Sequence, residues 1–375
     1  MSRRILFAIR SKLGDTLISY ACVRAFADAH PEDDVVLLTR RAYARFLRGE
    51  AGIRVIDFDS RIEMFFKLMW LRLTAPGFDV LAVLWGSGAP IRRIGQWVKA
   101  KRKIAWRKSL APEIFEEGVL AADPLLIEPA LSVIQAFEPG FVFPSALCIP
   151  SLVERRSARL RNMHAQAIGI VPIADELRRN LDAASLQQLI TAVMARHPGV
   201  ALRVFLNPIN NGAETVVAQG FPSNVQLYTF SSLDDLVDQY MTLTAWYGTD
   251  TGLYHLAVAC GIPATVFFGP TQPHKIVMPA QPAVRVYRLA VLGAAHCDEK
   301  ACTRPLCLHG SIAAFAGVAA ATRLDETPPT CPLRAHGAAA LTKIADLSPA
   351  VSPAVLPIDP RADQTPNCPQ DARAA

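Results

Sequence analysis

The sequence has no apolar run long enough to cross a membrane. A membrane-spanning helix needs about 20 consecutive apolar residues, and the best candidate, residues 64–73, is interrupted by Lys67 and Arg72. The N-terminus has only the apolar stretch ILFAI before Arg10, which is too short for the apolar region of a signal peptide. We therefore expect a cytoplasmic protein.

The sequence also lacks the C-x2-C pairs of common zinc sites, although it contains 8 cysteines. Four of them could still offer thiolates to a metal, because three are evenly spaced and a fourth follows downstream: Cys297, Cys302, Cys307 and Cys331. We expect neither a metal nor a cofactor, and a site at these four cysteines is the alternative. From Ser348 onward Pro, Ala and Asp dominate, so we expect residues 348–375 to be a disordered tail.

Positive charge is unevenly distributed, although the net charge is only +6. A basic cluster lies within a short segment: Arg92, Arg93, Lys99, Lys101, Arg102, Lys103, Arg107 and Lys108. It is typical of a solvated helix face, or of a surface that meets phosphate groups on a lipid-linked acceptor or an anionic leaflet. It therefore leaves open a peripheral contact with the inner face of the inner membrane, and we expect no nucleic-acid partner.

The most informative stretch is Ala245–Thr271, AWYGTDTGLYHLAVACGIPATVFFGPT. An apolar lead-in, a polar turn, a helix over 253–260 and an apolar strand over 264–268 follow one another, which predicts a βαβ unit of a parallel sheet. Ligands of such units collect at the carboxyl ends of the strands, where helix N-termini offer backbone N–H groups to an anion.

The chain opens with a similar pattern. An apolar strand over 4–9 precedes Gly14 and Asp15, and a helical pattern follows over 16–30. Asp15 is interpreted either as a helix cap or, because it lies at the carboxyl end of the first strand, as a catalytic carboxylate.

Strands and helices alternate along most of the chain, which predicts an α/β fold of two doubly wound domains. We place the domains at residues 1–155 and 166–330, because residues 151–165 are charged and have little apolar pattern. After Thr271 the pattern weakens, apart from an Ala-rich helix expected at about 311–322.

The turn of residues 249–252 contains small hydroxyl residues and glycine at a helix N-terminus, which suits a diphosphate. His255 follows Thr251 by four residues and lies on the same side of the helix, where it can donate to a phosphate oxygen. Asp15 is expected to face this turn across an interdomain cleft and to deprotonate an attacking hydroxyl. This combination predicts glycosyl transfer without a metal.

At this point the sequence resembles glycosyltransferase family 9, the ADP-heptose lipopolysaccharide heptosyltransferases and their relatives. Residues 248–271 are similar to the family's GNDSGPxHLAAAxGxPxxxLFGPT block, residues 5–31 to its opening, and FDVLAVLWGS at 78–87 to its FDxxIDLQG strand. The resemblance implies a GT-B fold, in which two Rossmann-like domains face a cleft. It also implies an N-terminal acceptor domain, a C-terminal nucleotide-sugar domain and an inverting transfer from ADP-heptose to lipopolysaccharide core.

The resemblance implies roles for particular residues. Asp15 takes the position of the general base. The positions that contact the donor are taken by Arg179, Glu214, Asp250, Thr251, Gly252 and His255.

The sequence departs from the family at several places in the donor half, one of which is Leu253, where the family has Pro or Ser after the glycine. The family's HPGAS segment is VPIAD here, residues 171–175, and its Trp is Leu181. Two alternatives therefore stay open. One is a GT-B transferase or epimerase that uses another nucleotide sugar, and the other is a non-catalytic, degenerate member that acts as an interaction or metal-binding module.

Overall fold

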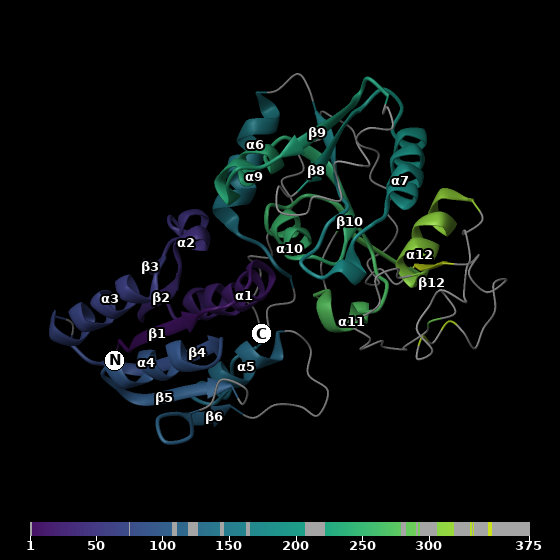
Figure 1. The fold of residues 1–375 in the computed structure, drawn as a ribbon. Helices are drawn as coiled ribbons and strands as arrows, with labels where there is room; N and C mark the ends of the chain where they lie inside the picture. Colours follow the sequence, from purple (N-terminus) through teal and green to yellow (C-terminus); the bar gives the residue numbers. More distant parts are fainter. Residues whose placement is uncertain are drawn as a thin grey trace. The chain divides into compact units, whose positions relative to one another are not determined.

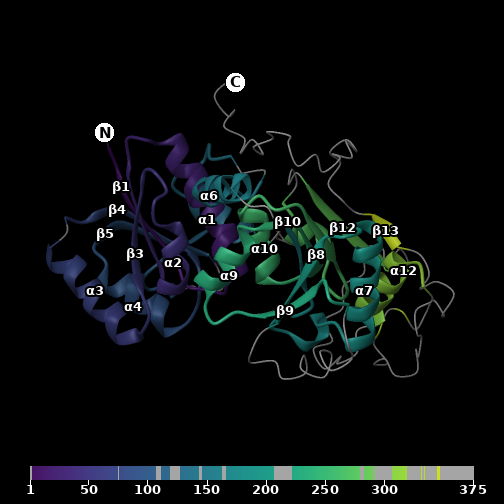
Figure 2. The ribbon, with the colours of Figure 1, turned by 90° about the horizontal axis from the view of Figure 1, so that it is seen from above.

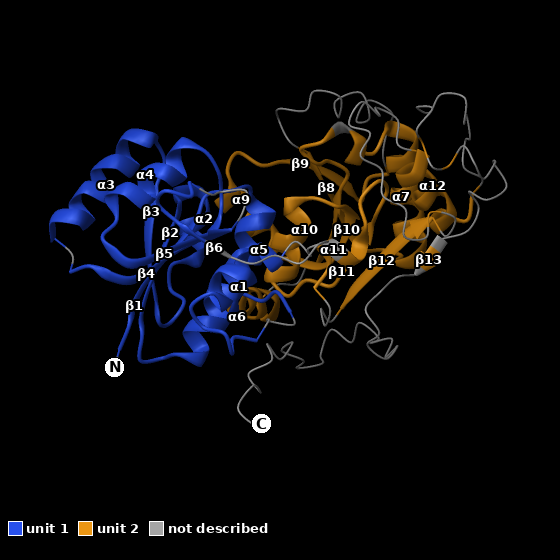
Figure 3. Ribbon diagram, turned by 90° about the horizontal axis from the view of Figure 1, so that it is seen from below, with its two compact units in different colours: residues 1–151 blue, residues 152–375 orange. Residues whose placement is uncertain are grey.

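The structure, a computed structural model, describes residues 2–74, 76–106, 111–118, 127–142, 146–162, 166–206, 222–278, 283–289, 292, 306–318, 331, 333 and 344–346. The chain divides into two compact units, Met1–Ser151 and Leu152–Ala375, which are coloured separately in Figure 3. Each unit is described by itself. The expected tail, residues 348–375, lies outside the described residues, as do five members of the expected sites and of the basic cluster: Arg107, Lys108, Glu214, Cys297 and Cys302.

Unit 1 is built on a six-stranded parallel sheet in the order β3-β2-β1-β4-β5-β6 (Figure 1). Its strands are β1 Arg4–Ile9, β2 Asp34–Arg40, β3 Ile53–Phe58, β4 Phe78–Trp85, β5 Ala100–Trp106 and β6 Glu116–Gly118. Its helices are α1 Leu13–Ala29, α2 Arg41–Leu47, α3 Arg61–Thr74, α4 Ala89–Trp97 and α5 Glu128–Gln135.

Helices cover both faces of this sheet, so its central strands are apolar on both sides. On one face, Met64 and Leu68 of α3 and Ile91 of α4 share a core cluster with Leu6 of β1. The neighbouring residue Phe7 points to the other face, as the alternation of a strand requires, and its ring contacts Phe26 of α1 at 5.5 Å between centroids.

Unit 2 contains a seven-stranded sheet in the order β13-β12-β11-β10-β7-β8-β9, in which β13 alone runs antiparallel to its neighbour. Its strands are β7 Ala167–Val171, β8 Ala201–Leu206, β9 Val225–Thr229, β10 Leu243–Thr249, β11 Ala264–Phe267, β12 Val284–Leu289 and β13 Ile344–Asp346. Its helical segments are α6 Pro150–Arg161, which begins at the boundary, η2 Leu177–Arg179, α7 Ala183–Arg196, α9 Leu233–Tyr240, α10 Gly252–Ala259, α11 Pro273–Ile276 and α12 Leu306–Ala316.

The two sheets share one strand order. The first strand of each unit lies between the second and the fourth, so β1 pairs with β2 and β4, and β7 pairs with β8 and β10. This is the doubly wound order, whose direction reverses next to the first strand, and ligands bind at the carboxyl ends of the strands at that switch point. The predicted α/β class with two Rossmann-like, doubly wound units is confirmed.

One of the two interpretations of the basic cluster, a single solvated helix face, is wrong. Helix α4 ends at Trp97, and residues 100–106 form β5, which pairs with β4. Several of its cations are already bound: Lys101 pairs with Asp79 at 2.7 Å, and Arg102 pairs with Glu116 at 2.7 Å. The apolar end of β5 is buried in the sheet. This burial favours a strand here, although the spacing of the charges suggested a helix.

The segment expected to be a charged boundary forms helix α6. Arg156 is only 7% exposed, and its guanidinium donates to the carbonyl oxygens of Leu243 at 2.9 Å and Gly261 at 3.1 Å. Burial lowers the pKa of Arg156 to about 10, so the group stays charged at neutral pH. Arg156 thereby holds α6 against the start of β10 in unit 2.

Candidate functional site

The turn between β10 and α10 presents an open helix N-terminus. Thr251 is the residue before the first turn of α10, with extended backbone angles of φ −149° and ψ 160°, and its side chain makes no capping hydrogen bond. The first backbone N–H groups of a helix have no partner within the helix. The Tyr254 N–H donates to the Thr251 carbonyl oxygen at 3.0 Å, but the Thr251 side chain caps none of these groups. Among the described residues, the N–H groups of Gly252 and Leu253 therefore remain available to an anion.

Asp250 joins three segments at this turn. Asp250 is buried, with an exposed fraction of only 4%. Arg179 donates through Nη1 to both Asp250 Oδ2 and the Asp250 carbonyl oxygen, each at 3.1 Å, and Thr271 donates through its hydroxyl to Asp250 Oδ2 at 2.8 Å. The loops that follow β7, β10 and β11 are thereby tied together at their carboxyl ends.

Arg179 reaches the turn from the short helix η2, which follows β7. Its side chain is 19% exposed, and Nη2 also lies 3.4 Å from Glu176 Oε1. Its Nε is buried and has no hydrogen-bond partner within the described part of the chain. A positive group therefore lies beside the open N-terminus of α10 and retains an unused donor.

His255 lies in the first turn of α10 and is 5% exposed. Burial lowers the pKa of its imidazole to about 4; nearby Arg179 lowers it further, and Asp250 opposes this. His255 is therefore neutral at neutral pH, so it adds no positive charge, although one ring N–H can still donate. No hydrogen bond to its ring is found among the described residues, and its nearest aromatic contact is Tyr254, 4.7 Å between ring centroids.

The predicted donor residues that the structure describes meet at the switch point of the second sheet. Arg179 follows β7 and Asp250 follows β10, and these strands are neighbours. Their backbones approach closely at Gly248, where an added Cβ would lie 2.5 Å from the carbonyl oxygen of Val171. The structure brings together Arg179, Asp250, Thr251, Gly252 and His255.

Asp15 lies in unit 1, in the first turn of α1 rather than before the helix, because α1 begins at Leu13. It follows β1, the strand next to the switch point of the first sheet, and it is half-buried. The Ser11 hydroxyl donates to the Asp15 carboxylate. Asp15 and the β10 turn belong to separate units, so their expected meeting across a cleft stays a prediction.

Two tryptophans end neighbouring strands of the unit 1 sheet, at the edge where β1 leads to Asp15. The rings of Trp85, at the end of β4, and Trp106, at the end of β5, are stacked with centroids 4.6 Å apart and planes 15° apart. The carboxyl ends of this sheet therefore lead to Asp15 and carry a stacked aromatic pair, in which Trp106 is buried and Trp85 is half-buried.

Two of the four cysteines fall within the described residues. Cys307 and Cys331 both pack against a small apolar cluster of Leu289, Leu292 and Leu333. The other two, and with them the four-cysteine site, lie outside the described residues, so that site stays a prediction. Among the described residues, one group offers three potential metal ligands, His30, Glu32 and Asp33, but Arg3 already binds Asp33 at 2.8 Å.

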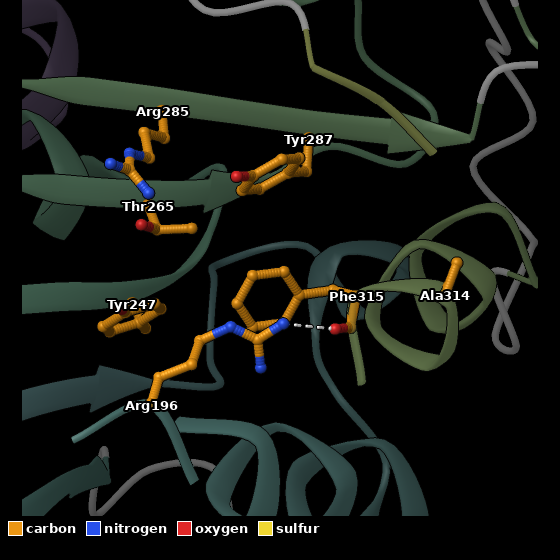
Figure 4. Close-up of a pocket in the computed structure, with 7 residues that line it drawn as sticks. All are labelled: Arg196, Tyr247, Thr265, Arg285, Tyr287, Ala314 and Phe315. Carbon is orange, nitrogen blue, oxygen red and sulfur yellow. Dashed lines mark hydrogen bonds between the residues drawn. The ribbon is translucent and has the colours of Figure 1, made fainter. Parts of the chain in front are cut away.

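A cavity of about 280 Å³ lies elsewhere in unit 2, between the sheet and helices α7 and α12 (Figure 4). Its lining residues are Arg196, Tyr247, Thr265, Arg285, Tyr287, Ala314 and Phe315. Arg196 donates to the Phe315 carbonyl oxygen at 2.8 Å and lies over its ring. Of the predicted donor residues that the structure describes, none lines this cavity.

The positioning contacts of the site were missed by the sequence analysis. Thr271 ends the FGPT part of the recognised block but had no assigned role, and Ser11 lies one helical turn before Asp15. The proximity of Ser11 to Asp15 was readable from their spacing. The contact between Thr271 and Asp250 joins positions 21 residues apart, so only the fold reveals it.

Two doubly wound units, one with an uncapped helix N-terminus at its switch point, form an architecture that is typical of nucleotide-binding folds. Residues 150–307 match the family model of glycosyltransferase family 9 (heptosyltransferase). The predicted resemblance to this family, and with it the class of enzyme, a glycosyltransferase, is confirmed. A comparison with curated protein sequences finds no match.

Solved structures agree with the fold. The ADP-heptose lipopolysaccharide heptosyltransferase II of E. coli has a TM-score of 0.63 at 18% identity, over 84% of this chain and 98% of that chain. The glycosyltransferase family 9 protein of Veillonella parvula DSM 2008 has a TM-score of 0.61 at 15% identity, over 76% of this chain and 85% of that chain. The E. coli heptosyltransferase WaaC has a TM-score of 0.59 at 18% identity, over 73% of this chain and 89% of that chain. The predicted GT-B fold class is confirmed.

Proposed function

We propose that the protein is an inverting, metal-independent glycosyltransferase. It moves a heptose or related sugar from a nucleotide-diphosphate donor, ADP-heptose, to a lipopolysaccharide core or another cell-envelope glycan. The observation that carries the proposal is the meeting of Arg179 and the uncapped N-terminus of α10 at the switch point of the second sheet.

The donor half stabilises the leaving diphosphate. The N–H groups at the start of α10 and the guanidinium of Arg179 are fixed donors, already oriented before the reaction, which is the property that makes such groups effective at developing charge. Neutral His255 contributes one ring N–H. Asp250 holds Arg179 in place, so we assign it a positioning role beside the diphosphate.

The acceptor half supplies the base. Asp15 deprotonates the attacking hydroxyl, and Ser11 orients its carboxylate. At the same edge of the sheet, the half-buried ring of Trp85 is backed by the buried ring of Trp106 and offers an apolar contact. We place the reaction at the cytoplasmic face of the inner membrane, because the proposed acceptor is linked to a lipid.

The choice of ADP-heptose is supported by relatives. E. coli WaaC has been solved with ADP and with ADP-2-deoxy-2-fluoro heptose. The VPIAD segment favours a second candidate, a transferase for another nucleotide sugar, because it lies beside the site. Ala174 N–H donates to Asn180 Oδ1 and Leu181 N–H donates to the Pro172 carbonyl oxygen, so these altered residues shape the loop that carries Arg179.

Thermal unfolding with ADP-, UDP-, GDP- and dTDP-linked sugars tests the donor. A ligand that binds only the folded state raises the unfolding temperature according to its concentration and Kd. We expect ADP-heptose to raise it and Arg179→Met to lose most of that shift, while Arg203→Met, on β8 away from the turn, keeps it. A shift with another nucleotide class alone would replace ADP-heptose by that donor. No shift with any of them would contradict the proposal.

A further inference from the structure

Helix α3 of unit 1 exposes a row of large apolar side chains. Their exposed fractions are 70% for Ile62, 56% for Phe66, 56% for Trp70 and 76% for Leu73. The spacing of four, four and three residues places them on one face of the helix. We call these four residues the α3 stripe.

The stripe is an additional apolar face and not the side that α3 buries. Met64, Leu68 and Leu71 face the sheet and are at most 3% exposed. With about 100° of rotation per residue, the two sets point in roughly opposite directions. Figures 2 and 3 both show α3 beside α4, on one side of the unit 1 sheet.

The exposed residues are concentrated on this helix. Seven large apolar residues are exposed among those that the structure describes, and four of them form the α3 stripe. Single exposed apolar residues are ordinary on a protein surface, but a contiguous group marks an interaction site. Phe65 extends the group, because its ring contacts Phe66 at 5.7 Å and Trp97 of α4 at 4.9 Å between centroids.

Exposed cations lie on α3 and on or just after the adjacent helix α4. Arg61 precedes it directly, Arg93 belongs to the adjacent helix α4, and Lys99 follows that helix. None of these three has an ion pair with a residue in the described ranges. By contrast, Lys67 of α3 is bound to Asp57 at 2.6 Å, so its charge is largely neutralised.

This combination fits a lipid surface with anionic headgroups. A helix that lies in the membrane interface buries an apolar face rich in Trp, Phe and Leu, and neighbouring Lys and Arg residues attract anionic lipids. A second copy of the chain fits less well. In a two-fold dimer across the stripe each patch would meet itself, so Arg61, Arg93 and Lys99 would face like charges.

We propose that the α3 stripe is a membrane-docking surface, which inserts into the headgroup region of an anionic bilayer. Helix α3 lies on the surface and does not span, since no helix among the described residues is long and apolar enough to cross a membrane. Docking needs neither donor nor acceptor, so the proposal can succeed or fail independently of the transferase reaction.

Flotation of the full chain with vesicles tests this proposal. Vesicles of phosphatidylcholine with phosphatidylglycerol should carry the protein upward in the gradient, and pure phosphatidylcholine vesicles should carry less. Phe66→Ser with Trp70→Ser should weaken binding to the mixed vesicles about tenfold or more, since two buried aromatic contacts are lost. Arg61→Gln with Arg93→Gln and Lys99→Gln should remove the preference for the anionic lipid.

The matched control is Val142→Ser with Leu227→Ser, two exposed apolar residues outside α3, which should bind like the wild type. Trp70→Phe should keep binding but lose much of the tryptophan quenching by brominated lipids, which reports insertion at this position. Equal binding by the Phe66, Trp70 double variant would overturn the proposal. Failure of the wild type to bind vesicles would also overturn it. If sedimentation then showed a dimer that the double variant disrupts, the stripe would be an interface between two copies of the chain.

Discussion

At the scale of single residues, the protonation state of His255 decides whether it could bind a diphosphate by charge or only by a hydrogen bond. Its burial against Tyr254, with Arg179 nearby, lowers its pKa to about 4, so its charge cannot hold a diphosphate at neutral pH. The sequence indicated this histidine from its place beside the turn, but its protonation depends on burial, which only the fold determines. Its role in the site is that of a neutral donor.

The same burial predicts a pH dependence of stability. In the unfolded chain His255 takes up a proton as the pH falls below about 6.5, whereas in the folded chain it stays neutral until about 4. Proton uptake therefore favours the unfolded state, and stability is lost as the pH falls through this window. We expect His255→Gln to remove about 3 kcal/mol of this acid-dependent loss.

The measurement is the free energy of unfolding in denaturant at several pH values between 4 and 7, for the wild type and His255→Gln. As the pH falls, the free energy of unfolding should decrease more steeply for the wild type than for His255→Gln. Parallel curves would show that His255 is not buried in its neutral form.

At the scale of elements, the stretch over β10, α10 and β11 was predicted closely. The helix expected over 253–260 is Gly252–Ala259, and the strand expected over 264–268 is Ala264–Phe267. Gly and Pro punctuate this stretch, and its apolar runs are continuous, so local pattern and burial agree. The sequence analysis did not predict that the cations of residues 100–103 lie on β5, because that strand is fixed by pairing with β4. It also did not predict helix α6, which is held in place by the buried Arg156.

A glycine fixes the approach of β10 to β7. At Gly248 an added Cβ would meet the Val171 carbonyl oxygen at 2.5 Å and the Trp246 ring at 2.7 Å. We expect Gly248→Ala to lower the free energy of unfolding by about 1 to 3 kcal/mol, because two packed strands must move apart. Gly140→Ala is the matched control, since an added Cβ there meets nothing within 4 Å.

Denaturant unfolding of both variants checks this expectation. Stability equal to the wild type in Gly248→Ala would mean that the strands are not held this close. Because Asp250 and Arg179 follow these two strands, we also expect Gly248→Ala to weaken donor binding.

At the scale of the whole molecule, two units repeat one strand order, and each presents predicted functional residues at its switch point. Unit 2 brings together Arg179 and the β10 turn, while Asp15 lies at the equivalent edge of unit 1. The alternation of strands and helices was enough to predict the doubly wound class of both units, but not the strands β6 and β12. The antiparallel strand β13 was not predicted, because it is three residues long and follows a region of weak pattern.

The central claim is that Asp15 of one unit activates an acceptor for a donor held by the other. The most direct measurement is release of ADP from ADP-heptose with a core acceptor, together with donor affinity, for Asp15→Asn and for Asp28→Asn, an exposed acid on the same helix. We predict that Asp15→Asn loses about 10² to 10⁴-fold in turnover and keeps its donor affinity, while Asp28→Asn behaves like the wild type. Turnover retained in Asp15→Asn would contradict the account.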